Sequence, residues 1–168
     1  MKTVKTPLTD EVINGLRVGD MLMLSGYIYC GRDAVLPRIV ELADEGRLGG
    51  HGIELSGSVI FHTAVSCAGV GPTSSNKLEI ESSIIPLSAA GVKLHLGKGS
   101  LKKETVEGLD KYNSVYAVIP PVTALLAKNT VKSELIAFPE LGMEAFYRLE
   151  VNDYPVIIAA AHGASIYK

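Results

Sequence analysis

Residues 21–40 read MLMLSGYIYCGRDAVLPRIV and join a predicted strand to a predicted helix. Residues 21–30 are mostly apolar, as is typical of a strand, and Gly26 predicts either an interruption or a bulge within it. Asp33 is the predicted N-cap of the helix, because a carboxylate at that position accepts a hydrogen bond from a free backbone N–H. Apolar residues then recur at helical spacing on one side. The stretch therefore predicts a strand–loop–helix unit, a building block of α/β folds.

The alternation continues on both sides of this unit. Thr9 precedes two acidic residues, which predicts a capped helix running to about Leu16. Further helices are predicted around 78–85 and over 102–112 and 121–128, and further strands over 58–65, 91–99, 114–119, 144–151 and 154–161, with a last one at the C-terminus. Strands also cluster at both ends of the chain. We therefore expect one α/β domain over residues 1–168, with a mixed sheet flanked by helices.

Composition excludes one class of partner. The 168 residues carry a formal net charge of -2, and the sequence has no run of basic residues. Nucleic-acid binding needs clustered Lys and Arg, so we expect no nucleic-acid partner. The hydrophobic fraction of 47% is high for a lone domain, which favours burial against another chain in a homo- or hetero-oligomer.

The N-terminus, MKTVKTPLTDE, lacks the apolar segment of a signal peptide. The longest apolar stretch covers residues 115–127 and is interrupted by Pro120 and Pro121. It is shorter than the roughly 20 residues that a membrane helix needs. We therefore expect a soluble, cytoplasmic protein that does not enter a membrane.

Four short polar motifs each follow a predicted strand: GRD at 31–33, GPTSSNKLE at 71–79, GKGS at 97–100 and ELGMEA at 140–145. Binding sites of α/β folds usually lie at strand ends. In the second motif, Thr73, Ser74 or Ser75 could cap the helix that follows. The free N–H groups of the same helix end would also attract a carboxylate or phosphate. Both interpretations stay open at this point.

The cations in these motifs are Arg32, Lys77 and Lys98. Together with the Thr73 hydroxyl, they indicate a small dianion as ligand, without completing a catalytic apparatus. Arg32 could bind a carboxylate with its planar fork, or form an ion pair with Asp33 or another local acid. The GKGS motif lacks the spacing, and the Ser or Thr after the lysine, that a phosphate-binding P-loop requires.

Several kinds of catalytic site have no signature in the sequence. It contains neither a G-x-S-x-G nor an H-E-x-x-H motif. His62 and His95 lie within predicted strands, where we expect a core or hydrogen-bonded role. Cys30 and Cys67 are too far apart for a C-x-x-C site and too few for a cluster, so we expect ordinary thiols.

Taken in order, the motifs resemble the C-terminal domain of class I, iron–sulfur-dependent fumarate hydratases, which is a separate β subunit in many organisms. The resemblance runs from TPLTDEVINGLRVGDMLMLSGYIYCGRDA through GSVIFHTA, GPTSSNKLE, HLGKGS and YNSVYAVIPPVTALL to ELGMEAFYRLEVNDYPVIIA. It implies a swivelling β/β/α domain, a partner α subunit that carries a [4Fe-4S] cluster, and reversible hydration of fumarate to L-malate. The β subunit of L-tartrate dehydratase is also similar, so the substrate stays open.

The resemblance also implies residue roles. Arg32 would bind a substrate carboxylate, and Lys98 would be a second substrate-binding cation. Thr73 would place its hydroxyl at the substrate carbon that gains or loses a proton, although a threonine needs a further acceptor to act as a base. Lys77 occupies the place of a substrate-binding arginine, and Ser74 replaces a threonine of the family pattern. The cations would stabilise negative charge that develops in the transition state.

Three departures from the family pattern leave alternatives open: Ser74 and Lys77 in the GPTSSNKLE motif, Leu36 where a histidine is common, and Pro120-Pro121 where a glycine-rich turn is usual. The leading hypothesis is the β subunit of a two-chain fumarate hydratase, active only with its α subunit. The second is the β subunit of L-tartrate dehydratase or of a related hydroxy-acid hydro-lyase. The third is a non-catalytic swivelling domain that binds a partner or a small anion.

Overall fold

The computed structural model describes residues 2–66, 69–73, 77–120 and 128–166, without the side chains of residues 64–80. Its elements are β1 Lys2–Lys5, α1 Asp10–Asn14, β2 Met21–Cys30, α2 Leu36–Asp44, η1 Leu48–His51, β3 Val59–Phe61, β4 Thr63–Ser66, β5 Gly69–Thr73, α3 Lys77–Ala89, β6 Leu94–Gly97, α4 Lys103–Lys111, β7 Val115–Val118, β8 Thr130–Ala137, η2 Pro139–Glu144, β9 Phe146–Ala161 and β10 Ala164–Ser165.

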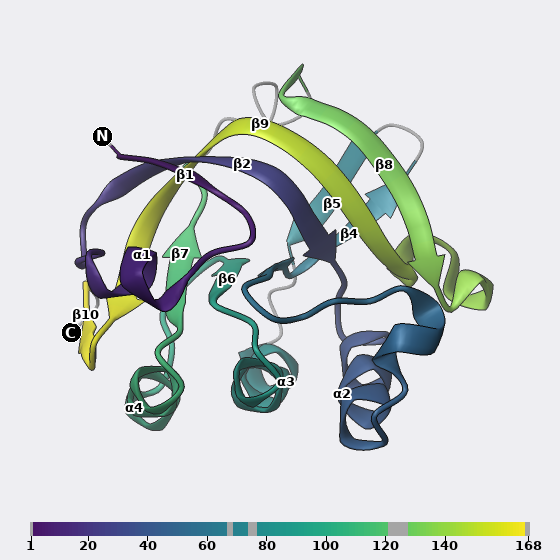
Figure 1. Ribbon diagram of the computed structural model, residues 1–168, viewed down its shortest axis with the longest axis horizontal. Helices are drawn as coiled ribbons and strands as arrows, with labels where there is room; N and C mark the ends of the chain where they lie inside the picture. The colour runs from purple at the N-terminus through teal and green to yellow at the C-terminus, as the bar shows by residue number, and fades with distance from the viewer. Residues whose placement is uncertain (1, 67–68, 74–76, 121–127, 167–168) are drawn as a thin grey trace.

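Within the described ranges, eight strands form one mixed sheet that closes on itself. Strands β2, β3, β6 and β7 run parallel to one another. Strand β9 is antiparallel to both β2 and β7, and its double pairing completes the ring. Figure 1 shows β1, β2, β9 and β8 arching over β6 and β7, with α2, α3 and α4 beneath them. These layers confirm the expected mixed α/β fold.

The inner parallel strands are covered on both faces. Leu94 and Leu96 of β6, with Val115 and Ala117 of β7, belong to the core between the two layers of sheet. Tyr116 points the other way and packs in a cluster with residues of α3 and α4. Such burial on both faces explains why these strands read as continuous apolar runs, as predicted for residues 114–119.

The long strand β9 corrects one prediction. Residues 144–151 and 154–161 were expected to form separate strands, but β9 is a single strand of 16 residues. The pairing of β2 with β9 shifts register between Leu24 and Gly26, which confirms the bulge predicted at Gly26. The backbone N–H of Asp153 donates to Ser25 Oγ over 3.0 Å. The two polar residues Asn152 and Asp153 are therefore accommodated at the bulge instead of forming a turn.

Of the two N-cap residues predicted for α1 and α2, one is confirmed and one is wrong. Thr9 does cap α1, because its Oγ1 accepts from Val12 N. Asp33 was wrongly predicted to cap α2, since that helix begins at Leu36 and has no side-chain cap hydrogen bond. The backbone instead closes a turn in which the Arg32 carbonyl accepts from the N–H of Leu36. The predicted helix over 121–128 lies outside the described residues, except for Lys128.

The predicted strand over 58–65 is divided at His62 into β3 and β4. Strand β3 pairs with β6 in the main sheet, whereas β4 pairs with β5 in a separate hairpin. Gly71 and Pro72 of the GPTSSNKLE motif belong to β5. Strands β1 and β8 are polar along much of their length and were not predicted.

Candidate functional site

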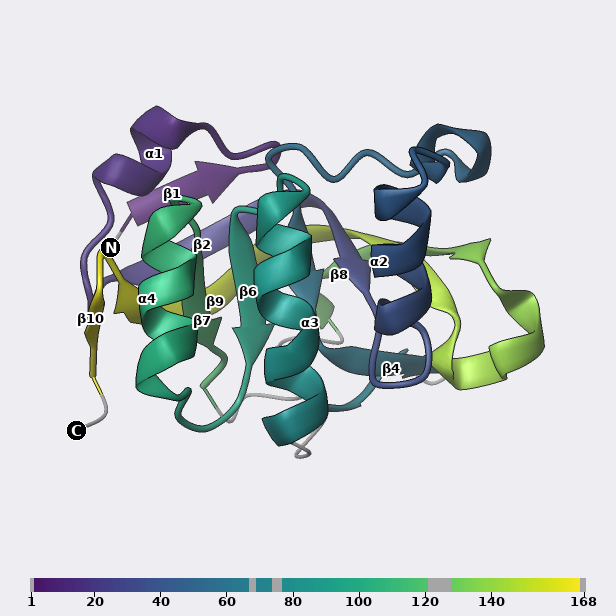
Figure 2. The same cartoon turned by 90° about the horizontal axis from the view of Figure 1, so that it is seen from below.

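The parallel strands bring three of the four polar motifs to the same region. Because β2, β3, β6 and β7 are parallel, their carboxyl ends lie at one edge of the sheet. Arg32 follows β2 by two residues, and Lys98 follows β6 directly. The β4–β5 hairpin follows β3 and leads into α3. Figure 2 shows the ends of β6 and β7 at this edge, next to the start of α3.

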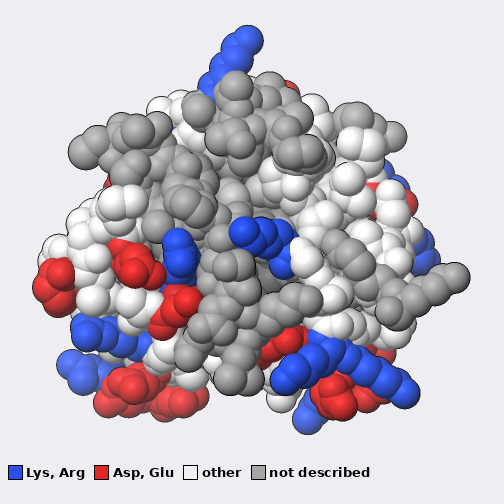
Figure 3. All heavy atoms as spheres, turned by 180° about the vertical axis from the view of Figure 1, so that it is seen from behind, with Lys and Arg blue, Asp and Glu red and all other residues white. Residues whose placement is uncertain are grey.

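Seen from behind, as in Figure 3, the molecule presents this edge to the viewer. Basic side chains lie near the centre of the face, and basic and acidic side chains are intermixed around its periphery. On the part of the face that the structure describes, the charges do not form a basic stripe of the kind that tracks a nucleic acid. None of the described helices combines the length and apolar composition that a membrane crossing requires.

Arg32 lies beside an acidic residue from the far end of the chain. Its Nε is 3.8 Å from Glu144 Oε1, and about a quarter of the arginine side chain (26%) is exposed. Gly31, the residue before Arg32, lets the backbone pack closely against Val35, because a Cβ at position 31 would lie 2.7 Å from Val35 Cγ1. Glu144 belongs to the ELGMEA motif, which forms η2. The GRD and ELGMEA motifs are therefore neighbours in space.

Lys98 is exposed, on a loop that two neighbouring elements hold. The buried Tyr116 of β7 donates its hydroxyl proton to the Gly99 carbonyl over 3.1 Å. Lys102 N donates to Glu81 Oε1 of α3 over 2.6 Å. Neither Tyr116 nor Glu81 was predicted as part of the site, because both act on the loop from distant parts of the sequence.

The structure places the remaining predicted residues only in part. Thr73 is the last residue of β5, and its backbone pairs with that of Thr63, which directly follows His62. Lys77 is the first residue of α3. The side chains of Thr73 and Lys77 and the whole of Ser74 lie outside the described part of the chain. Whether one of these hydroxyls caps α3 therefore stays a prediction.

A buried chain of hydrogen bonds runs beneath α3. His62 Nε2 is 3.1 Å from His95 Nδ1, and His95 Nε2 is 2.9 Å from Ser88 Oγ. This confirms the hydrogen-bonded role expected for both histidines. His62 follows β3, so this series of hydrogen bonds ends near the edge that carries Arg32 and Lys98. Among the residues that the structure describes, none bonds to the buried Nδ1 of His62.

Burial keeps both imidazoles neutral. It lowers the pKa of His62 to about 4, because an imidazolium would lose its hydration there. Burial, and then the neighbouring His62, hold the pKa of His95 well below its ordinary value. The pair is therefore electrically neutral at physiological pH, and each ring carries a single proton for hydrogen bonding.

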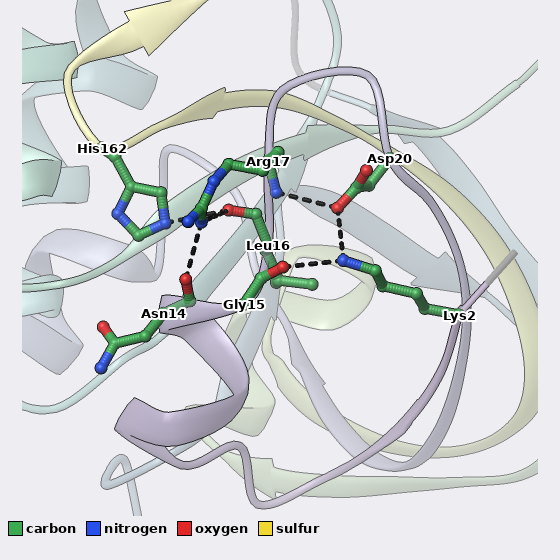
Figure 4. A network of polar contacts seen from close by, with 7 residues as sticks. All are labelled: Lys2, Asn14, Gly15, Leu16, Arg17, Asp20 and His162. Atoms are coloured by element: carbon green, nitrogen blue, oxygen red, sulfur yellow. Dashed lines mark hydrogen bonds and ion pairs between the residues drawn. The ribbon is translucent and has the colours of Figure 1, made fainter.

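A second polar network lies at the opposite edge of the sheet, before the start of β2 (Figure 4). Lys2 Nζ donates to Asp20 Oδ2 over 2.9 Å, and this bond is the main reason that the pKa of Asp20 is lowered. The guanidinium of Arg17 and Nε2 of His162 both bond to the Leu16 carbonyl. These contacts join β1, α1 and the turn after β9, so we assign them to the fold.

The described cysteine does not suit a metal cluster. Cys30 is completely buried in the core between the sheets, and burial raises the pKa of its thiol. Cluster ligation requires a thiolate. Within the described ranges, no group of three or more His, Cys, Asp or Glu side chains is placed to hold a metal ion. Cys67 lies outside those ranges.

Comparisons with known proteins find related sequences over nearly the whole chain. The model of the family described as Fumarase C-terminus matches residues 2–168. A protein of Methanocaldococcus jannaschii, provisionally named L(+)-tartrate dehydratase subunit beta, is 34% identical over 96% of this chain and 88% of its own length. The L(+)-tartrate dehydratase subunit beta of Escherichia coli K12 is 31% identical over 98% of this chain and 86% of its own. The anaerobic class I fumarate hydratase of the same organism is 30% identical over 84% of this chain, but over 27% of its own length.

Proposed function

Because this chain belongs to the Fumarase C-terminus family, we propose that it is the β subunit of a two-chain hydro-lyase that acts on a four-carbon dicarboxylate. The observation that supports this most is the placement of Arg32 and Lys98 after two parallel strands of one sheet. The start of α3 at Lys77 lies at the same edge. Cations from separate loops at one edge suit a substrate with a carboxylate at each end.

In this proposal, Arg32 and Lys98 bind substrate carboxylates, and Ser74 and Lys77 of the GPTSSNKLE motif contribute further contacts to the substrate. Removing a proton from the carbon beside a carboxylate puts negative charge onto that carboxylate. Fixed cations stabilise this charge more strongly than they stabilise the substrate, which lowers the barrier. Thr73 is the proposed group through which that proton moves.

We assign the [4Fe-4S] cluster to the α subunit. The described thiol of this chain, Cys30, is buried in the core and held as a neutral thiol, so it does not fit a cluster ligand. The groups that bind substrate carboxylates and transfer the proton are the ones that we assign to this chain.

Two substrates deserve direct comparison. Hydration of fumarate to L-malate is the first candidate, because the motifs resemble class I fumarate hydratases throughout. Dehydration of L(+)-tartrate is the second, and the relatives favour it: two proteins named as its β subunit match over 86–88% of their own length. Both substrates present two carboxylates to the same cations.

The test is reconstitution with a partner. We expect the purified chain to be inactive, and we expect anaerobic co-expression with a cluster-bearing α subunit to give turnover of fumarate or of L(+)-tartrate. Ultraviolet absorbance follows fumarate, and release of a 2-oxo acid follows tartrate. A complex that assembles with an intact cluster, yet turns over neither substrate, would contradict the proposal and favour a non-catalytic binding domain.

Changing Arg32 to lysine tests the predicted carboxylate contact. Lysine keeps the charge but loses the planar fork. Hydrogen bonds to charged groups contribute about 1.5–3 kcal/mol, so we expect KM to rise about tenfold to a hundredfold. Arg47→Lys is the matched control, because Arg47 is 67% exposed and lies 3.9 Å from the local acid Glu45. Steady-state kinetics would contradict the assignment if both variants kept the wild-type KM.

A further inference from the structure

The loop that carries Lys98 ends in an unusual helix cap. Lys102 is the N-cap residue of α4 and has no side-chain cap hydrogen bond of its own. A lysine side chain has no acceptor to offer a free N–H. The acceptor comes instead from another helix, because Glu81 Oε1 of α3 lies 2.6 Å from Lys102 N. A carboxylate suits this position, since the N-terminus of a helix carries partial positive charge.

The same bond joins two parts of the proposed site. Glu81 lies four residues after Lys77, the first residue of α3. Positions four residues apart lie on the same face of a helix, one turn from each other. The face of α3 that begins at position 77 is thus held against the loop 98–102. Tyr116 fixes the start of that loop through its bond to the Gly99 carbonyl.

We propose that Glu81 is a positioning residue that sets the spacing between Lys98 and the first turn of α3. This inference rests on the proposed function, in which Lys98 and Lys77 bind one dicarboxylate. Without the carboxylate, the loop 98–102 keeps its Tyr116 contact but loses this hydrogen bond to α3. Lys98 then samples a wider range of positions, and a substrate that needs both cations is bound less well.

Glu81 can also be replaced by a shorter residue without leaving a cavity in the core. Glu81 lines a surface hollow of about 420 Å³ together with Ser82, Lys102, Glu104 and Thr105. Shortening its side chain therefore enlarges an open hollow and leaves no sealed cavity in the core. Glu104 is the matched control, because it is an exposed acidic residue in the first turn of α4.

The experiment compares Glu81→Ala, Glu81→Gln and Glu104→Gln in the reconstituted complex and as isolated chains. We expect Glu81→Ala to raise KM about tenfold with a much smaller change in kcat. Glu81→Gln keeps a neutral acceptor and should lie between Glu81→Ala and the wild type. Glu104→Gln should resemble the wild type. Because a purely structural role would lower the melting temperature without this split between KM and kcat, an unchanged KM in Glu81→Ala would overturn the inference.

Hydrogen exchange on the isolated chains tests the geometry without any substrate. The segment 99–102 should exchange about tenfold faster in Glu81→Ala than in Glu104→Gln. Equal exchange in the two variants would overturn the inference, even in an active enzyme. Absence of turnover in the wild-type complex would overturn the proposed function, while the exchange result would still decide whether Glu81 holds the loop.

Discussion

Turnover by the reconstituted enzyme is expected to fall by about 10²–10⁴-fold when Thr73 is replaced by valine, which is the usual contribution of a positioned proton-transfer group. Valine has nearly the same shape as threonine and suits a strand, so β5 should keep its backbone pairing with Thr63. The change therefore removes the hydroxyl and little else. Steady-state kcat and KM are the measurements that check this expectation.

The competing interpretation of Thr73 predicts a different result. If its hydroxyl caps α3, valine should lower the free energy of unfolding by about 0.5–2 kcal/mol and leave kcat almost unchanged. Thr3→Val in β1 is the matched control, because Thr3 is an exposed strand residue outside the candidate site. A loss of thermal stability in Thr73→Val alone, with normal kinetics, would assign Thr73 to the cap.

The free energy of unfolding should decrease by about 2 kcal/mol on account of His62 when the pH is lowered from 7.5 to 5. Burial lowers the pKa of His62 to about 4 in the folded state, against an ordinary value of 6.5. The contribution of His62 to the free energy of unfolding is therefore fully present above pH 6.5. It is lost as the pH falls toward 4, because over this range His62 takes up a proton only in the unfolded chain. His95 acts in the same direction.

Other groups contribute below this window. Asp10 and Asp20 also have lowered pKa values, but their ordinary value of 3.8 places their effect at more acidic pH. Urea unfolding at pH 7.5 and 5 should give His62→Gln a smaller difference between the two conditions than the wild type. His51→Gln should keep the full difference, because His51 is exposed. If the free energy of unfolding of His62→Gln changed between pH 7.5 and 5 by as much as that of the wild type, the assignment of this pH dependence to His62 would be contradicted.

The sequence was informative where a property is local. Strand β2 with its bulge at Gly26, the Thr9 cap and the two-sided burial of β7 all follow from nearby residues. The helix cap predicted at Asp33 was wrong because the Arg32 carbonyl accepts from the N–H of Leu36, and this bond closes a turn before α2 begins. Strand β9 was divided wrongly because Asn152 and Asp153 have turn propensity, which the pairing with β2 overrides.

In the candidate site, too, local features could be predicted from the sequence and long-range contacts could not. The placement of Arg32 and Lys98 at one edge of the sheet was predictable because each follows a strand and stands in a recognisable motif, whereas their binding role stays a prediction. The contacts that surround them were not, since Glu144 reaches Arg32, and Glu81 reaches Lys102, across long separations in sequence. The hydrogen bond between His62 and His95 depends likewise on the pairing of β3 with β6. Nothing in either local sequence indicates these partners.

The double pairing of β9 has a consequence for biosynthesis. A ribosome synthesises residues 146–161 only after β2, β3, β6 and β7. Until then, one edge of β2 and one edge of β7 lack the strand that joins them. Nascent chains therefore expose two open edges to chaperones or to neighbouring polysomes, and the ring is completed only when residues 146–161 leave the exit tunnel.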